Sequence, residues 1–318
     1  MTIDVIEMAR RASAAVGARS PGTKVSDVRP LAGGHSSLTY SAVTSAGNRV
    51  VVKVAPPGLP PVRNRDVLRQ ARILDVLASS AVKVPRVLGT DAGDPPLFVM
   101  SMAEGESYEP LLSRSETTAT REEIANRALA AAAMLSALHA EDAQGVDEDA
   151  LSLDTELERW AKAFSTVDDD VRDGADECLS RLQKAVPDEM PASIVHGDWR
   201  LGNMLCVGDR IEAVIDWEIW SVGDPRIDVA WFLLLADPLH PRCIRTDSGM
   251  PAVKHLHHAY AKAAGRHLPD MKWFGALVRY KQAAASALIV KNARKKDPGA
   301  PASAAVAELL RQAVDYLD

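Results

Sequence analysis

The sequence predicts an α+β protein in which a small sheet with one main helix precedes a larger, mostly helical part. The first observation is a β-type pattern up to about residue 100, where a Gly47-Asn48 turn leads into the β-branched run 50–54. The second is the helical spacing of apolar residues after residue 105. The third is a short β-rich island at residues 193–217, which interrupts the helices.

The elements follow from local patterns taken in order. Residues 25–55 are typical of strand, turn and strand, and prolines at 56–61 then break the pattern. Apolar spacing predicts the main helix over 64–79. Short strands are expected near 84–88 and 97–100, with a turn at 91–95 between them. The later helices are expected at about 121–140, 153–165, 171–185, 251–265, 271–292 and 301–317.

Composition restricts the class of protein. A chain of 318 residues with 47% hydrophobic residues can bury a sizeable core without disulfides. The net charge of −6 argues against a nucleic-acid-binding surface. The three scattered cysteines fit a reducing compartment and form no metal-binding pair. Because no apolar run reaches membrane-spanning length and no secretion signal is evident, we expect a cytoplasmic protein that does not bind membranes.

Three polar side chains follow the strands of the β-rich island. Asp198 ends a tight His-Gly-Asp turn, Asn203 ends the loop behind it, and Asp216 follows a second apolar strand. This order predicts that the three side chains lie in one small volume. Phosphoryl transfer needs such a set, with one carboxylate to orient a hydroxyl and an amide plus a carboxylate to hold Mg²⁺. The alternative is that these residues only support turns.

The same motifs resemble a known family. HGDxxxxN at 196–203, IDWE at 215–218 and GDPxxD at 223–228 are similar to the aminoglycoside phosphotransferase (choline-kinase-like) family, whose members are relatives of protein kinases. The resemblance covers about residues 25–235. It implies a bilobal, protein-kinase-like fold with a nucleotide-binding lobe in residues 1–102 and a catalytic and substrate-binding lobe in residues 103–318.

The resemblance also assigns roles in the first lobe. Lys53 lies where the family places the lysine that binds the α- and β-phosphates, and an exposed edge-strand lysine is the alternative. A loop in the family covers the phosphates, for which a plain hairpin turn is the alternative, and a hinge binds the adenine edge through its backbone. The corresponding loop residues are Gly33, Gly34, Ser36 and Ser37, and the hinge residues are Met100, Ser101 and Met102.

In the second lobe, the resemblance makes Asp198 the catalytic base and makes Asn203 and Asp216 the Mg²⁺ ligands. His196 is expected to hold the loop together rather than to transfer protons. Arg200 is expected to pair with a carboxylate, with a phosphate contact as the alternative.

Four further interpretations concern residues around this loop. Glu218 lies on the same strand face as Asp216 if the chain is extended there. It is then expected either to reach the metal or a substrate cation, or to form a structural salt bridge. Asp224 and Asp228 are expected to cap the next helix and to brace the loop. The tryptophans near this loop are expected either to line a pocket or to pack in the core. They are Trp199, Trp217, Trp220 and Trp231.

One position departs from the family pattern. The family has a glutamate on the first-lobe helix that pairs with the lysine, whereas this sequence has Gln70. An amide can accept a hydrogen bond from Lys53 but offers no charge. We therefore expect Gln70 to belong to the nucleotide site as a neutral partner of Lys53.

The sequence thus predicts an Mg²⁺-dependent kinase that transfers the γ-phosphate of ATP or GTP to a hydroxyl of a small molecule. The resemblance admits aminoglycosides, other antibiotics and metabolites as acceptors. One alternative is a nucleotide-binding pseudokinase with a regulatory role, which only Gln70 favours. Another is a metal-dependent hydrolase that uses the same acids.

Overall fold

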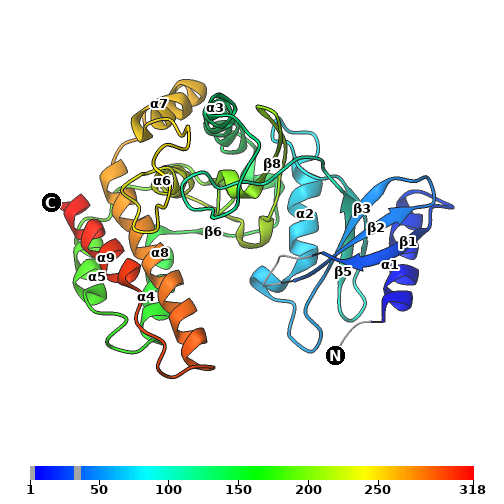
Figure 1. The fold of residues 1–318 in the computed structure, drawn as a ribbon, viewed down its shortest axis with the longest axis horizontal. Helices are drawn as coiled ribbons and strands as arrows, with labels where there is room; N and C mark the ends of the chain where they lie inside the picture. Colours follow the sequence, from blue (N-terminus) through cyan, green and yellow to red (C-terminus); the bar gives the residue numbers. More distant parts are fainter. Residues whose placement is uncertain (1–3, 32–36) are drawn as a thin grey trace. The chain divides into compact units, whose positions relative to one another are not determined.

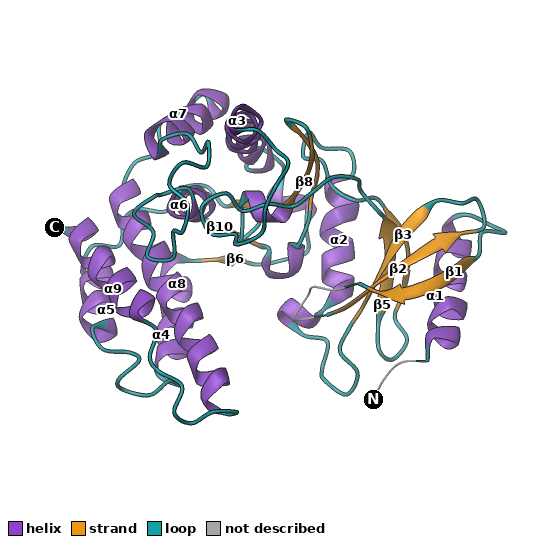
Figure 2. Ribbon diagram, in the orientation of Figure 1, coloured by secondary structure: helices purple, strands orange, loops and turns teal. Residues whose placement is uncertain are grey.

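The computed structural model describes residues 4–31 and 37–318, which form two compact units. Most strands belong to the first unit and most helices to the second (Figures 1 and 2), so the predicted α+β fold is confirmed. The division between residues 102 and 103 stays a prediction. The first unit consists of Met1–Ser107, Gln144–Val146 and Asn203–Trp220, and the second of Tyr108–Ala143, Asp147–Gly202 and Ser221–Asp318.

An antiparallel sheet of five strands forms the centre of the first unit. Its strands lie in the order β1-β2-β3-β5-β4. The bounds are β1 (Val25–Pro30), β2 (Leu38–Thr44), β3 (Arg49–Val54), β4 (Val87–Asp91) and β5 (Leu97–Ser101).

The two helices of this unit use opposite faces of β3. Val50, Val52 and Val54 are fully buried in a cluster with Met8 of α1 (Val5–Arg19). Because successive side chains of a strand alternate between faces, Lys53 points to the other side of the sheet. There it contacts Gln70 of helix α2 (Val67–Leu77). Asp66 caps the start of this helix, because its side chain accepts a hydrogen bond from the Arg69 N–H at 2.9 Å.

Helix α1 was not expected from the sequence. Its buried residues are Met8, Arg11, Ala12, Ala15 and Val16, and this mixture of one charged, two small and two larger apolar side chains gives a weak hydrophobic pattern. The signal that identifies it is local, since Asp4 caps the helix through the Ile6 N–H at 3.0 Å. The helices with predicted ranges lie within a few residues of them, whereas the helix at Arg226–Leu235 was expected only as the helix that follows Asp224 and had no predicted range.

A hairpin far along the chain also belongs to the first unit. Strands β8 (Met204–Val207) and β9 (Arg210–Val214) pair antiparallel, with Met204 opposite Val214. In a hairpin the start of the first strand lies beside the end of the second. The residues just before β8 and just after β9 are therefore neighbours. The short 3₁₀ helix η4 (Trp217–Ile219) follows.

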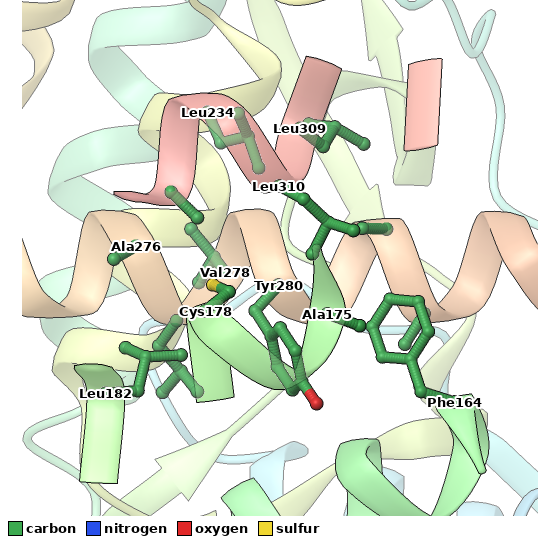
Figure 3. Packing of buried hydrophobic residues seen from close by; sticks show 14 of the residues in the cluster. Phe164, Ala175, Cys178, Leu182, Leu234, Ala276, Val278, Tyr280, Leu309 and Leu310 are labelled. Atoms are coloured by element: carbon green, nitrogen blue, oxygen red, sulfur yellow. The ribbon is translucent and has the colours of Figure 1, made fainter. Parts of the chain in front are cut away.

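The second unit is built around one long helix, α8. This helix buries residues on all sides, as expected for a helix at the centre of a core. Phe164, Cys178 and Leu309 from three other helices pack around it (Figure 3). The helices are α3 (Arg121–Leu138), α4 (Leu153–Phe164), α5 (Ala175–Lys184), α6 (Arg226–Leu235), α7 (Val253–Ala264), α8 (Met271–Arg294) and α9 (Ala304–Leu317).

A small sheet connects this helical core to the His-Gly-Asp loop. Strand β10 (Ser221–Gly223) lies between β6 (Ala150–Leu151) and β7 (Ser193–Val195), parallel to the first and antiparallel to the second. Strand β7 leads into the loop, and β10 leads into α6. Among the described residues, no helix is both long and apolar enough to cross a lipid bilayer.

Candidate active site

Lys53 and Gln70 form the expected neutral pair in the first unit. The Lys53 Nζ donates a hydrogen bond to Gln70 Oε1 at 3.0 Å, and both side chains are buried. The Gln70 amide nitrogen in turn donates to the Asn64 carbonyl at 3.4 Å, which fixes the orientation of the side chain. Gln70 therefore occupies the position from which a partner can hold this lysine.

Asn203 and Asp216 lie together at one end of the β8–β9 hairpin. The Ile215 N–H donates to the Asn203 carbonyl at 2.8 Å, which joins the two segments. Asp216 adopts a left-handed backbone conformation with φ of 66°, which aspartate tolerates better than most residues. Its carboxylate Oδ1 lies 3.8 Å from Lys53 Nζ. The first unit thus brings together three of the predicted site residues, Lys53, Gln70 and Asp216.

A small cavity lies beside Lys53. Its volume is about 20 Å³, which is enough for one water molecule. Met100, at the end of β5, contributes to its wall. The cavity is lined by Lys53, Gln70, Leu74, Pro85, Phe98, Met100, Ile215, Asp216 and Trp217.

The backbone N–H groups of the hinge residues Ser101 and Met102 already donate hydrogen bonds within the protein. The Ser101 N–H donates to the Arg86 carbonyl at 2.8 Å, and the Met102 N–H donates to the Arg49 carbonyl at 3.2 Å. A nucleotide base at this place would therefore have to find its donor at a later residue, such as Ala103.

The proposed phosphate-covering loop is described only at its end. Gly33, Gly34 and Ser36 lie outside the described residues. Ser37 is buried, and its Oγ finds no hydrogen-bond partner among the residues that the structure describes. A buried hydroxyl of this kind is costly unless a ligand or a water satisfies it.

The backbone of the His-Gly-Asp loop is braced in the second unit. Gly197 has a φ of 84°, a conformation that favours glycine. Asp228 of α6 is fully buried and accepts the N–H groups of His196 and Gly197 at 2.6 and 2.8 Å. Burial raises the pKa of Asp228, but its bonds to His139 and to this backbone hold the pKa below its usual value. The expected bracing role of Asp228 is therefore seen directly.

His196 makes a local structural contact. It is fully buried, and its Nδ1 lies 3.2 Å from the Asp198 N–H, which donates to it. Its ring packs edge-on against Trp199, with the ring centroids 5.7 Å apart. These contacts are those of a residue that holds the loop in shape.

The Asp198 carboxylate accepts hydrogen bonds from Arg200 and Trp231. Arg200 Nε donates to Asp198 Oδ2 at 3.0 Å, so the expected pairing of Arg200 with a carboxylate is confirmed. Trp231 Nε1 donates to Asp198 Oδ1 at 2.8 Å. The sequence left Trp231 between pocket lining and core packing. Its contact with Asp198 could not be read from spacing, because the two residues are far apart in sequence.

Glu109 is a residue of this site that the sequence did not single out. Its carboxylate Oε2 accepts the Gly202 N–H at 3.0 Å and lies 3.4 Å from Arg200 Nη1. A side chain at Gly202 would collide with both, since an added Cβ would lie 2.2 Å from Arg200 and 3.0 Å from Glu109. Glu109 thus holds the last part of the loop, and only the fold brings it there, across 93 positions of sequence.

The remaining predicted residues are less central. Asp224 accepts the Arg226 N–H at 3.0 Å and so caps the first turn of α6, as expected. Glu218 lies in the 3₁₀ helix η4, so the extended chain that would place it beside Asp216 on a strand face is not present. Its role stays a prediction. Trp199 and Trp217 are core residues, fully or almost fully buried.

The donor set suits Mg²⁺. Asn203 and Asp216 offer one amide and one carboxylate oxygen, and Mg²⁺ prefers such hard oxygen ligands. Among the described residues no three His, Cys, Asp or Glu side chains converge on a metal position.

The protonation of Glu109 should make stability depend on pH. Burial raises the pKa of Glu109 to about 7, despite the opposing charge of Arg200. Between pH 4.5 and 7 the folded state keeps a proton that the unfolded chain loses, so this group stabilises the fold at low pH and ceases to do so as pH rises through 7. Over this interval the wild type should lose up to about 3 kcal/mol of unfolding free energy from this group.

Glu109→Gln should remove that loss, because the amide does not titrate. Urea unfolding at pH 5 and pH 8 measures the change in unfolding free energy between the two pH values. The variant should gain stability relative to wild type at the higher pH. Glu122→Gln removes an exposed charge on α3 and should leave the pH dependence in place. An equal difference between Glu109→Gln and wild type at both pH values would contradict the raised pKa.

Curated proteins from other organisms match part of this chain. Mouse acyl-CoA dehydrogenase family member 10 is 27% identical over 213 residues, which are 63% of this chain and 20% of that protein. The chain spans about a fifth to a third of the length of the curated relatives it matches.

Solved structures share the fold. A Ralstonia eutropha JMP134 protein, provisionally described as an aminoglycoside phosphotransferase, matches with a TM-score of 0.72 at 22% identity over 92% of this chain and 90% of that one. A thermostable mutant of aminoglycoside phosphotransferase APH(4)-Ia, in a ternary complex with ADP and hygromycin B, matches with a TM-score of 0.60 at 17% identity over 92% and 94%.

The model of the phosphotransferase enzyme family matches residues 27–274, more than three quarters of the chain. The chain belongs to this family, and the resemblance inferred from its motifs is confirmed. The chain shares the fold of these solved structures, as the motifs implied.

Proposed function

We propose that this protein transfers the γ-phosphate of ATP or GTP to a hydroxyl group of a small molecule, with Mg²⁺ as the metal. The observation that carries the proposal is the position of Lys53, whose Nζ lies 3.0 Å from Gln70 and 3.8 Å from Asp216. A buried cation beside a carboxylate that can hold a metal is the arrangement that binds nucleotide phosphates in kinases.

In this proposal Asp198 orients the acceptor. The acceptor oxygen attacks the γ-phosphorus, the bond to the leaving nucleoside diphosphate breaks, and the hydroxyl proton passes to the Asp198 carboxylate. The hydrogen bonds from Arg200 and Trp231 occupy one position on each carboxylate oxygen. In general a carboxylate offers about four acceptor sites and can accept a hydroxyl group besides such donors.

Asn203 and Asp216 would hold the metal, and Lys53 would contact the phosphates. Bound Mg²⁺ would neutralise part of the phosphate charge. Ser37 supports the same proposal, since its buried hydroxyl needs a partner. A phosphate oxygen is a suitable acceptor for it. The ADP bound in the related APH(4)-Ia structure supports a nucleotide as the donor, and the hygromycin B bound there supports a small-molecule acceptor.

A two-stage experiment tests the function. Thermal-shift measurements with ATP and GTP, each with and without Mg²⁺, identify the donor. A small-molecule extract is then incubated with the protein and the preferred nucleotide, labelled in the γ-phosphate, and the products are separated. We expect an Mg²⁺-dependent shift and at least one labelled product. Free phosphate formed without any acceptor would indicate a hydrolase instead, and nucleotide binding with neither reaction would indicate a pseudokinase.

The Lys53–Gln70 pair gives a prediction for the same assay. Lys53→Met should lower kcat/KM for the nucleotide by more than tenfold, because the phosphate contact is lost while the chain length is kept. Gln70→Glu should keep or modestly raise kcat/KM, because Gln70 Oε1 already lies within hydrogen-bond distance of Lys53. The net change remains small because Coulomb attraction is offset by desolvation of the pair. A harmless Gln70→Ala together with less than a tenfold loss in Lys53→Met would contradict both assignments.

A further inference from the structure

Helix α6 contacts three consecutive residues of the His-Gly-Asp loop. Asp228 accepts the backbone N–H groups of His196 and Gly197. Trp231, three residues later on α6, reaches the side chain of Asp198 with its indole N–H at 2.8 Å. Residues three apart lie on one face of a helix, so the same face that braces the loop backbone also contacts the carboxylate.

A buried lysine lies behind this tryptophan. Lys281 of α8 is 5% exposed, and its Nζ lies 4.8 Å from the centre of the Trp231 ring. The same Nζ donates to the Gly197 carbonyl at 3.0 Å, directly before Asp198. Trp160 of α4 approaches Lys281 from another side, with its ring centre 5.8 Å from Nζ. Within the described part of the chain no carboxylate forms an ion pair with Lys281.

These contacts explain how a buried ammonium group is tolerated. An uncompensated charge in a protein interior is expensive unless polar groups face it. The Gly197 carbonyl and the two indole rings supply such groups, since the faces of aromatic rings attract cations. Lys281 therefore connects the loop backbone to the tryptophan that holds the Asp198 carboxylate.

We propose that Trp231 and Lys281 are positioning residues for Asp198, which fix the plane of its carboxylate toward the acceptor hydroxyl. The terminal torsion of an aspartate is broad, so a carboxylate without fixed donors rotates. Here Trp231 holds Oδ1 and Arg200 holds Oδ2. Lys281 contacts both the indole ring and the loop backbone and so keeps the two in fixed positions relative to each other. The proposal rests on the proposed role of Asp198 in transfer.

The hydrogen bond can be tested without any substrate. The chain has six tryptophans, so a protein with ¹⁵N-labelled indoles gives six Nε1–H signals in an NMR spectrum. Trp231→Phe identifies the Trp231 signal by its loss. In Asp198→Ala this signal should move upfield and exchange faster with solvent, and in Lys281→Met it should shift as well. A Trp231 signal that is unchanged in Asp198→Ala would overturn the proposal.

The functional consequence is measured with the nucleotide and acceptor identified by the extract screen. Trp231→Phe keeps an aromatic ring but removes the donor, and it should lower kcat by about 10- to 100-fold with KM for the nucleotide within twofold of wild type. Lys281→Met should lower kcat in the same way, by about fivefold or more.

Trp273→Phe is the matched control. Trp273 is also buried in this unit, and its indole N–H donates to the Leu182 carbonyl at 3.0 Å, away from the loop. This variant should lose stability as Trp231→Phe does, but it should keep kcat within twofold. A Trp231→Phe enzyme with wild-type kcat would refute the positioning role. Absence of transfer by the wild type would refute the proposed function itself, and the NMR result would still decide the contact.

Discussion

Asp198→Asn should abolish transfer to the acceptor while nucleotide affinity stays within about threefold of wild type. The substitution keeps the size of the side chain but removes the group that takes the hydroxyl proton, which typically contributes about 10²–10⁴-fold. The measurement is the rate of labelled product formation at saturating nucleotide, together with calorimetric affinity for the nucleotide and Mg²⁺.

Asp209→Asn provides the control for this experiment. Asp209 is exposed at the β8–β9 turn, so its replacement changes the net charge by the same amount without touching the site. The control should transfer phosphate at the wild-type rate. If Asp198→Asn retained turnover within tenfold of wild type, Asp198 would not be the base. A fall in thermal stability far beyond that of the control would point to a structural role in the loop instead.

Asp216→Ala should remove the Mg²⁺-dependent part of nucleotide binding. The carboxylate is proposed to anchor the metal, and its Oδ1 lies 3.8 Å from Lys53 Nζ. Its loss would remove the proposed metal ligand and the carboxylate beside Lys53, while the hydrogen bond of the lysine to Gln70 is kept. Calorimetric titration of the nucleotide with and without Mg²⁺ measures the effect, and the two affinities should become equal in the variant.

Asn203→Ala should be milder than Asp216→Ala, since it leaves the charged ligand in place. The order of the two variants is the informative result. Mg²⁺-dependent affinity that survives in Asp216→Ala at the wild-type value would show that the metal is held elsewhere. Because the Asn203 contact with Ile215 uses the backbone carbonyl, which alanine keeps, a larger loss in Asn203→Ala would mean that the Asn203 side chain is the stronger metal ligand.

Much of the first unit could be predicted because its signals are local. The β-branched run 50–54 becomes β3, and strict alternation along that strand sends Lys53 to the face opposite the valine cluster. The amphipathic spacing of 64–79 becomes α2 and carries Gln70 to the same face. Helix α1 was not expected because its buried face mixes alanines and a buried arginine with few large apolar residues, which gives little amphipathic contrast.

The site was predictable in part for a related reason. In the motif around Asn203 and Asp216, a short hairpin separates the two residues, and antiparallel pairing brings its ends together. In contrast, Glu109 and Trp231 lie far from Asp198 in sequence, and neither belongs to a motif that spacing could identify. The condition under which Glu218 would share a strand face with Asp216 is not met, because the chain turns at Asp216 into a 3₁₀ helix.

The sequence by itself determined the fold class and the family and supplied candidate residues for phosphoryl transfer, because these depend on residue type and short-range spacing. Only the tertiary structure decided how Asp198 is held. Arg200 is a near neighbour of Asp198, but Trp231, the lysine behind it and the buried Glu109 come from helices and a loop distant in sequence. Their contacts exist because the packing of the second unit brings those segments to one loop, and such long-range neighbours leave no periodic signal in the chain.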